Sequence, residues 1–470
     1  MTARTEYVQR WNIGWFKFTF AFATCILFLS SAYAFPLGFF ERLSSGSLLS
    51  LPGAQNLTIV ALLAAITPLL LYHFYKRNCA FHFVAIALLS AWIGATYCFS
   101  HSPDDYGGAS TASLGTMNEF DAICLLFGVL AHLIVMSAAL ETSSEFIARG
   151  LCYSIAGIAT IGGLTQWKKG RFEYHSAFRA TGLWNNPNTF GMFMACGLIV
   201  LCALIVNSSR IGSPADKSYR SNRYLRSLYL LILCLVSLGL GRSLSRGAWF
   251  ASVMGLGTFA LILSKTSCIA DLRRSMQTRA AILVFPAIIA FLASVVKFLG
   301  PTLRFRIISL IHPFDISISN RYDATVGILR IISDYPIRGV GWGNVISFYE
   351  GLYAPDYISH GGAITQNSML YVAGAAGIPC LVLIVASLGI REVLLHVFVA
   401  EITWTKISGI CFLVLLFGAV LDGALLNSEA ALAIWMLSVP CIVSSKRSKS
   451  YVAARLPVCF KNIDRETFSS

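Results

Sequence analysis

Charged residues are scarce in this chain of 470 residues, at 12% of the total, whereas 56% of the residues are hydrophobic. Typical soluble domains carry about 25% charged residues. The composition therefore excludes a soluble protein with a polar surface. The net charge of +14 does not indicate nucleic-acid binding either, because no basic module with interleaved aromatic residues lies outside the apolar runs.

The common metal and nucleotide motifs are also missing. The sequence has no H-E-x-x-H, no G-x-x-x-x-G-K, no D-x-D and no C-x-x-C. Its eight histidines are dispersed, and most of its thirteen cysteines lie in apolar runs, where a thiol packs as a small apolar group. We therefore predict no metal site, no cofactor and no disulfide framework.

Long apolar runs are what the chain does contain, and each is long enough to cross roughly 30 Å of hydrocarbon as a helix. The predicted fold is an all-α polytopic membrane protein with about twelve spans. One integral membrane domain over 1–470 contains a long loop at 300–365 that holds short helices. The predicted spans are 15–35, 56–75, 79–99, 120–140, 146–164, 187–206, 225–240, 248–264, 279–299, 366–388, 406–425 and 428–444.

The cations predict the orientation of these spans. Lys and Arg gather at the N-terminus, in alternate loops and in the tail after Lys446, so both termini are predicted to be cytoplasmic. The loop 100–119 carries acidic residues and no cation, which is typical of an outer loop. The remaining cations lie mainly in three outer segments, so we expect these segments to bind an anion.

Arg242 and Arg246 form the most unusual of these segments. They lie between the predicted spans 225–240 and 248–264, with no loop to carry them into water. Charge at the edge of the hydrocarbon is costly and usually marks a function. A helical turn would place both guanidinium groups on one side, because they are spaced i, i+4. The alternative is that such cations only contact the headgroups of membrane lipids.

The other two outer segments are 165–190, which contains Arg179, and the long loop 300–365. Apolar spacing over 324–333 predicts a short helix at the membrane interface. The glycine-rich run 339–343 follows it and allows tight turns. No strand precedes this run, so a dinucleotide site is not predicted.

In this order, these segments resemble the O-antigen ligase and polysaccharide-polymerase superfamily, bacterial inner-membrane glycosyltransferases that use lipid-linked sugars. The resemblance covers about 165–390 and rests on 179–188, 245–249, 335–343, 367–370 and Gly377. Where the family has His-Asn, this chain has Gln366-Asn367, and Cys380 replaces the second glycine of Gly-x-x-Gly. Glutamine cannot take a proton at neutral pH. If that histidine is the catalytic base of the family, this chain either has no such base or has it at another position.

The resemblance implies a periplasmic active site that takes glycan from undecaprenyl diphosphate. The acceptor would be a sugar of the lipid A core, as in a ligase, or of a second lipid-linked glycan, as in a polymerase. Guanidinium groups would hold the diphosphate and stabilise it as a leaving group, and a base would position the acceptor hydroxyl. The candidate catalytic residues are Arg246, Arg242, Arg179 and, as base, His360. The candidate substrate-binding residues are Arg321, Arg338, Gln366, Asn367 and Trp342.

Two other functions stay open. A transporter or flippase of lipid-linked saccharides also needs many spans, but it should carry charges along a cavity within them and show two related halves. Here the spans contain few charges, and no internal repeat is visible. A family member that only binds the glycan lipid, without catalysis, predicts the same sequence features.

Overall fold

Most of the predicted spans are helices in the structure, which is a computed structural model. It describes residues 61–70, 80–98, 120–167, 173–174, 177–184, 186–210, 217–265, 316–355, 365, 367–398, 403–421 and 430–445. Within these ranges, seven helices are long and apolar enough to cross a membrane, and three shorter apolar helices match three further predicted spans. The predicted spans 15–35 and 279–299 lie outside the described residues.

The elements follow one another as helices with a single small hairpin in the described part of the chain. Strands β1 (Glu173–Tyr174) and β2 (Ala177–Phe178) pair antiparallel over two residues each, and the other described elements are helices, which confirms the predicted all-α class. The helices before the long loop are α4 (Ala80–Cys98), α5 (Phe120–Glu141), α6 (Ser144–Thr165), α7 (Pro187–Arg210), α8 (Lys217–Ser243) and α9 (Arg246–Lys265). The later helices are α13 (Ile316–Asp334), α14 (Val345–Phe348), the π-helix η2 (Tyr349–Tyr353), α15 (Ser368–Ser387), α16 (Ile390–Val397) and α17 (Trp404–Leu421). Shorter apolar helices lie at Ala61–Leu70 and Ala430–Ser445.

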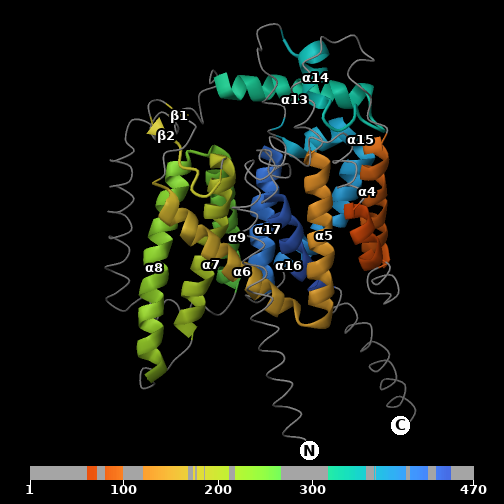
Figure 1. Cartoon of the computed structure of the whole chain (residues 1–470). Coiled ribbons are helices and arrows are strands. Elements are labelled where there is room, and N and C mark those ends of the chain that lie inside the picture. Colours follow the sequence, from red (N-terminus) through yellow and green to blue (C-terminus); the bar gives the residue numbers. More distant parts are fainter. Residues whose placement is uncertain are drawn as a thin grey trace, which may run out of the picture.

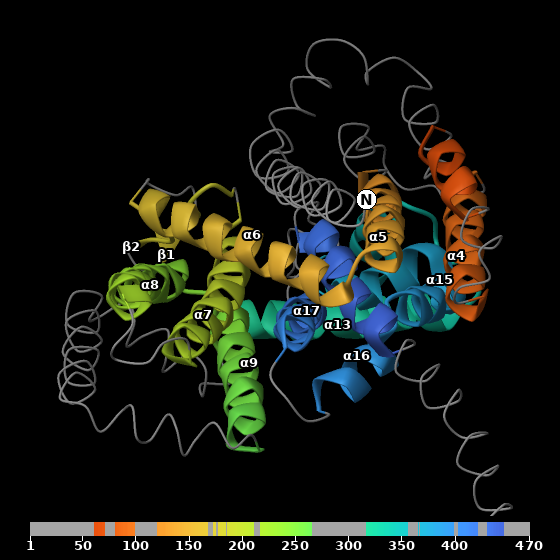
Figure 2. The ribbon, with the colours of Figure 1, turned by 90° about the horizontal axis from the view of Figure 1, so that it is seen from below.

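Helix α7 is the interior helix of one half of the bundle. It packs against α6, α8, α9 and α17, and 83% of its apolar window is buried, against 17% for α8 (Figure 2). Helix α8 is therefore largely uncovered by the other described helices. Helix α17 also contacts α15 and α16, so it joins this half to the half that contains α4 and α15.

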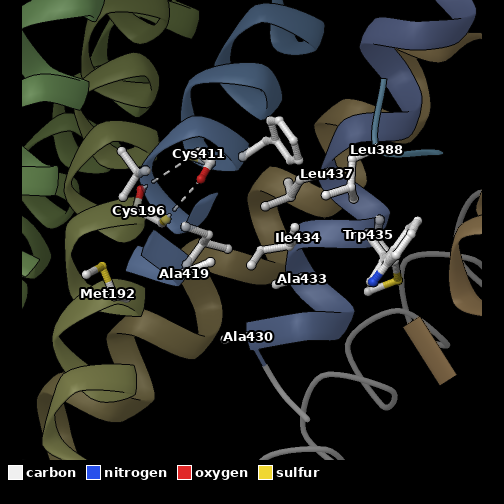
Figure 3. Packing of buried hydrophobic residues seen from close by; sticks show 14 of the residues in the cluster. Met192, Cys196, Leu388, Cys411, Ala419, Ala430, Ala433, Ile434, Trp435 and Leu437 are labelled. Carbon is white, nitrogen blue, oxygen red and sulfur yellow. Dashed lines mark hydrogen bonds between the residues drawn. The ribbon is translucent and has the colours of Figure 1, made fainter. Parts of the chain in front are cut away.

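Small and sulfur-containing side chains allow the central helices to approach closely. The thiols of Cys196 and Cys411 each donate to the other residue's carbonyl oxygen, at 3.6 and 3.8 Å, which joins α7 to α17 (Figure 3). Both cysteines are fully buried. Their role is packing, as expected of thiols in an apolar interior.

Helix α13 lies across one end of the bundle, at the end where β1 and β2 are found (Figure 1). Its buried residues Ala324, Ile328 and Ile331 recur at helical spacing, whereas Tyr322 and Arg330 are exposed. The predicted interfacial helix is thus present, but it begins at Ile316 instead of Ala324. Within residues 316–355, helix α13 is followed by turns and then by α14 and η2.

Helix α15 is broken at Gly377, which has φ 83° and ψ 167°. Pro379 follows and has no N–H to donate, while the N–H of Ile378 turns outward to the carbonyl of Pro336, at 2.8 Å. Three carbonyl groups at the break accept from outside the helix. The contacts are Val340 N to Gly374 O at 2.9 Å, Gly341 N to Ala375 O at 2.9 Å, and Trp92 Nε1 to Ala376 O at 2.8 Å. The glycine-rich run 339–343 therefore supplies donors that a broken helix in lipid requires.

A buried histidine pair joins three helices elsewhere in the core. His82 of α4 and His132 of α5 meet at 2.9 Å between their Nε2 atoms, and Nδ1 of His132 lies 2.8 Å from the carbonyl oxygen of Trp435. Because that carbonyl only accepts, His132 donates from Nδ1 and accepts at Nε2 from His82. The pair stabilises the packing of α4, α5 and the helix Ala430–Ser445.

Replacing His132 with leucine should lower the free energy of unfolding by about 1–2 kcal/mol, because His82 loses its contact with the His132 ring and the Trp435 carbonyl loses one of its two side-chain donors. Thermal unfolding in detergent measures this as a lower midpoint. Ser90→Ala is the matched control, since the Ser90 hydroxyl bonds only within α4, to Ile86 O. Equal midpoints for the two variants would show that the histidine contacts contribute nothing.

Candidate functional site

The predicted arginine segment is a tight connection between α8 and α9, and we call residues 241–247 the arginine turn. Helix α8 ends at Ser243 and α9 begins at Arg246, so no loop separates them, as predicted. Leu244 has φ +50°, a backbone conformation that residues other than glycine rarely adopt. The helix is interrupted there. A continuous helical turn, the condition under which the i, i+4 spacing would place both guanidinium groups on one side, is therefore not met.

All four terminal carbonyl groups of α8 are satisfied, which fixes the turn. The C-terminal end of a helix leaves four such acceptors without helical partners. The Leu240 carbonyl accepts from Ser243 Oγ at 2.7 Å and from Trp249 Nε1 at 3.0 Å, and the Gly241 carbonyl accepts from Leu244 N at 3.2 Å. The Arg242 carbonyl accepts from Ala180 N at 2.9 Å. The Ser243 carbonyl accepts from Arg179 Nε at 2.9 Å. Two of these donors come from the segment after β2. The first and second predicted outer segments are therefore in direct contact.

Arg179 holds this contact together. Its Nε binds Ser243 O, and its Nη2 donates to the side-chain oxygen of Asn188 at 2.5 Å, at the start of α7. The Asn186 side chain in turn accepts from the backbone N–H of Asn188 at 2.8 Å. Two edges of the Arg179 guanidinium thus join α7 to the end of α8. Arg179 positions the arginine turn.

Arg242 is held differently. Its guanidinium carbon lies 4.4 Å from the ring centroid of Trp167, which follows α6 and is 61% exposed. Its side chain has no hydrogen-bond acceptor among the described residues, and its Nε is buried. Stacking on an aromatic face leaves the in-plane N–H groups of a guanidinium able to bind an anion. At the last turn of α8, the cation also complements the helix dipole.

Arg246 is the first residue of α9 and is half-buried. A cation here faces the positive end of the α9 dipole, which is unfavourable without a nearby anion. The preceding Ser245 is buried, and its hydroxyl accepts from Ala248 N at 3.3 Å. The structure therefore places Arg179, Arg242 and Arg246 on one small region formed by the starts of α7 and α9 and the end of α8.

The long-loop candidates lie at the same end of the bundle but elsewhere on it. Nη1 of Arg321, on α13, lies 3.4 Å from Leu421 O at the end of α17. Arg338 is exposed before the glycine-rich run. Asn367 is the N-cap of α15, where its side-chain oxygen accepts from Leu370 N at 3.1 Å. Its predicted role with the acceptor thus coexists with a capping role. His360 and Gln366 lie outside the described residues.

Trp342 corrects another expectation. Its indole is 3% exposed, and its Nε1 donates to Thr96 of α4 at 3.0 Å, so the ring lies in the core and is not placed to stack on a sugar. Trp184 and Tyr349, two further aromatic residues of the outer segments, are also buried. Trp184 stacks on Phe193, with ring centroids 5.0 Å apart. These rings anchor the outer segments to the bundle.

Tyr353 ties η2 to the end of α13. Its hydroxyl donates to the Asp334 carboxylate at 2.5 Å. Desolvation of the phenol and this hydrogen bond raise the pKa of Tyr353 well above its usual value. The phenol therefore stays protonated and remains a donor throughout the physiological pH range. Among the described residues, no three His, Cys, Asp or Glu side chains are grouped as a metal site.

Residues 228–385 match the family model described as O-antigen ligase. These residues form an O-antigen ligase domain. The matched range includes the arginine turn, α13, the glycine-rich run and the break in α15. A comparison with curated proteins gives no match. Over residues 228–385 the match confirms the family that the sequence motifs resemble, and the seven helices that are long and apolar enough to cross a membrane indicate a multi-pass membrane protein.

Two residues that contact the candidate arginines were not predicted from the sequence. Trp167 appears as an ordinary aromatic residue at the end of a span, and Asn188 as a helix-start residue after a proline. Asn188 does lie within the motif 179–188, so the motif marked the segment but not the contact. Nothing in the sequence pattern connects Trp167 with Arg242, because the two residues are joined only by the packing of α6 against α8.

Proposed function

We propose that this protein transfers or polymerises a glycan from undecaprenyl diphosphate onto a sugar acceptor at the periplasmic face of the bacterial inner membrane. The observation that carries the proposal is Arg242. Its guanidinium is stacked on Trp167, has no hydrogen-bond acceptor among the described residues, and lies in an O-antigen ligase domain. A diphosphate offers the bidentate acceptors that such a group binds.

The reaction is a substitution at the anomeric carbon of the donor sugar. The bond from that carbon to the diphosphate oxygen breaks, and the acceptor hydroxyl oxygen forms the new glycosidic bond. Undecaprenyl diphosphate leaves with the bonding electron pair, and the hydroxyl proton passes to a base. Arg242 and Arg246 stabilise the negative charge that grows on the leaving group. His360 is our candidate for the base, and Arg321, Arg338, Gln366 and Asn367 are candidates for contacts with the glycan.

A one-sided active site also agrees with where the buried charges lie. Among the described residues, Lys406 is the one buried Lys, Arg, Asp or Glu, and it belongs to the first turn of α17, at the opposite end from the arginine turn. A flippase needs polar groups along a path through the spans. This distribution favours glycan transfer over transport.

Gel analysis of envelope glycans from a deletion strain tests the proposal. A ligase predicts loss of long chains on the lipid A core, with lipid-linked polymer accumulating. A polymerase predicts single repeat units in place of long chains. Expression of the wild-type gene should restore the original pattern in either case. Unchanged glycans in the deletion strain would contradict both activities, and accumulation of donor on the cytoplasmic face would support the flippase alternative instead.

A further inference from the structure

A cavity of about 150 Å³ lies between α6, α7 and the start of α17. Helix α6 leads from this cavity to Trp167 beside the arginine turn, and α7 begins at that turn and ends here. The cavity is therefore at the opposite end of the bundle from the candidate active site. Its charged lining residues are Glu145 and Arg149, and Asn207 and Trp404 line it as well.

Glu145 does not neutralise the cavity, because its carboxylate caps α17. One oxygen accepts from Trp404 N at 2.7 Å, and the other accepts from Thr405 N at 3.0 Å and from the Thr405 hydroxyl at 2.9 Å. The positive end of the α17 dipole offsets part of the carboxylate charge. Glu145 is thus a structural acceptor whose oxygens are already occupied.

Arg149 is the cation that remains. Its spacing from Glu145 suits an i, i+4 ion pair, but Glu145 faces α17 instead. The guanidinium of Arg149 lies 5.9 Å from the ring centroid of Trp404 and makes no hydrogen bond or ion pair with another described residue. It is exposed, and it lines the cavity.

We propose that this cavity binds the phosphate group of an anionic membrane lipid. The Arg149 guanidinium and the Asn207 amide supply donors for phosphate oxygens, while Val206 and Ile407 give an apolar wall for the glycerol and upper acyl chains. Basic pockets between spans bind anionic headgroups in this way.

Native mass spectrometry of the full-length protein in detergent tests the site, with phosphatidylglycerol, phosphatidylcholine and inorganic phosphate as probes. Wild type should retain phosphatidylglycerol preferentially. Arg149→Ala should weaken its retention about tenfold, as expected for one charge-assisted contact. Arg391→Ala is the matched control, because Arg391 is an exposed arginine on α16 that does not line the cavity. Asn207→Ala gives a second variant, which should weaken retention less.

Three results would overturn the proposal. The first is equal retention by wild type and Arg149→Ala, and the second is an equal loss in Arg391→Ala, which would indicate attraction to the general surface charge. The third is occupation by inorganic phosphate with no lipid retained, which would assign the cavity to a soluble anion. If Arg149→Ala does not fold, unchanged retention in Asn207→Ala also overturns it. Glycan transfer is not needed for this measurement, so its outcome is independent of the proposed function.

Discussion

Replacing Arg242 with alanine is expected to lower glycan transfer by about 100-fold or more, the loss seen when a donor that stabilises a developing negative charge is removed. The side chain has no hydrogen-bond acceptor among the described residues and contacts the Trp167 face, so its removal costs the fold little. Thermal unfolding of the variant should therefore match that of wild type. Transfer is measured with purified protein, lipid-linked glycan and acceptor, together with envelope glycans in cells.

Conservative variants distinguish a bidentate diphosphate contact from a simple positive charge. Arg242→Lys keeps the charge but not the planar pair of donors, and we expect it to stay far below wild type. Trp167→Phe keeps a ring face and should lower transfer only a few-fold, because a cation–π contact at an exposed site contributes about 0.5–1 kcal/mol. Arg246→Ala should lose activity as fully as Arg242→Ala. Arg330→Ala is the control, since Arg330 is exposed on α13 at the same end.

A variant of Arg179 tests whether a residue holds the arginine turn in place or binds the substrate. Arg179→Ala removes two hydrogen bonds and leaves the terminal carbonyl of α8 without a partner, so it should lower both activity and thermal stability. Loss of activity without loss of stability is the result expected for Arg242. Full glycan output from Arg242→Ala would remove the diphosphate contact from the mechanism.

The positions of the helices could be predicted from the sequence, because the length of an apolar run is enough to identify a membrane span. The sequence also predicted that α8 and α9 are joined without a loop, since the apolar runs on either side leave no room for one. Helix α8 begins before the predicted apolar run because the basic cluster at its start is helical too. Hydropathy cannot show this, since a helix can continue into the polar region beyond the hydrocarbon.

Contacts between distant segments were not predictable from local pattern. Ala180 N and Arg179 Nε complete the end of α8, which lies more than a whole helix further along the chain. The sequence predicted only that the glycine-rich run allows tight turns. In the structure, the run is a structural partner of broken α15, because the carbonyls freed there must be satisfied within the protein. Sequence motifs marked the segments, and packing decided which of them bind backbone and which can bind substrate.

Replacing Gly377 with alanine should give the largest loss of folded protein of any single change proposed. A Cβ at this position would lie 1.8 Å from Ile337 O, and the backbone has φ +83°. To relieve this clash, the glycine-rich run could move away from α15, which would leave the α15 carbonyl groups without donors. The alternative is that α15 becomes a continuous helix, which Pro379 opposes because it has no N–H to donate. We expect a cost of about 4 kcal/mol or more, which places the change among the most destabilising substitutions. The yield of monodisperse protein in detergent and its unfolding midpoint measure this.

Gly339→Ala tests the same interface from its other side. Its Cβ would lie 2.4 Å from the backbone of Ala375, so this variant should resemble Gly377→Ala. Gly351→Ala, in η2, is the matched control, because a Cβ there meets nothing within 4 Å. Since both damaging changes separate the same two segments, the double variant should be little worse than either single one. A stable Gly377→Ala protein with normal glycan output would mean that the break in α15 is not required, and the glycine-rich run would then need a role at the substrate.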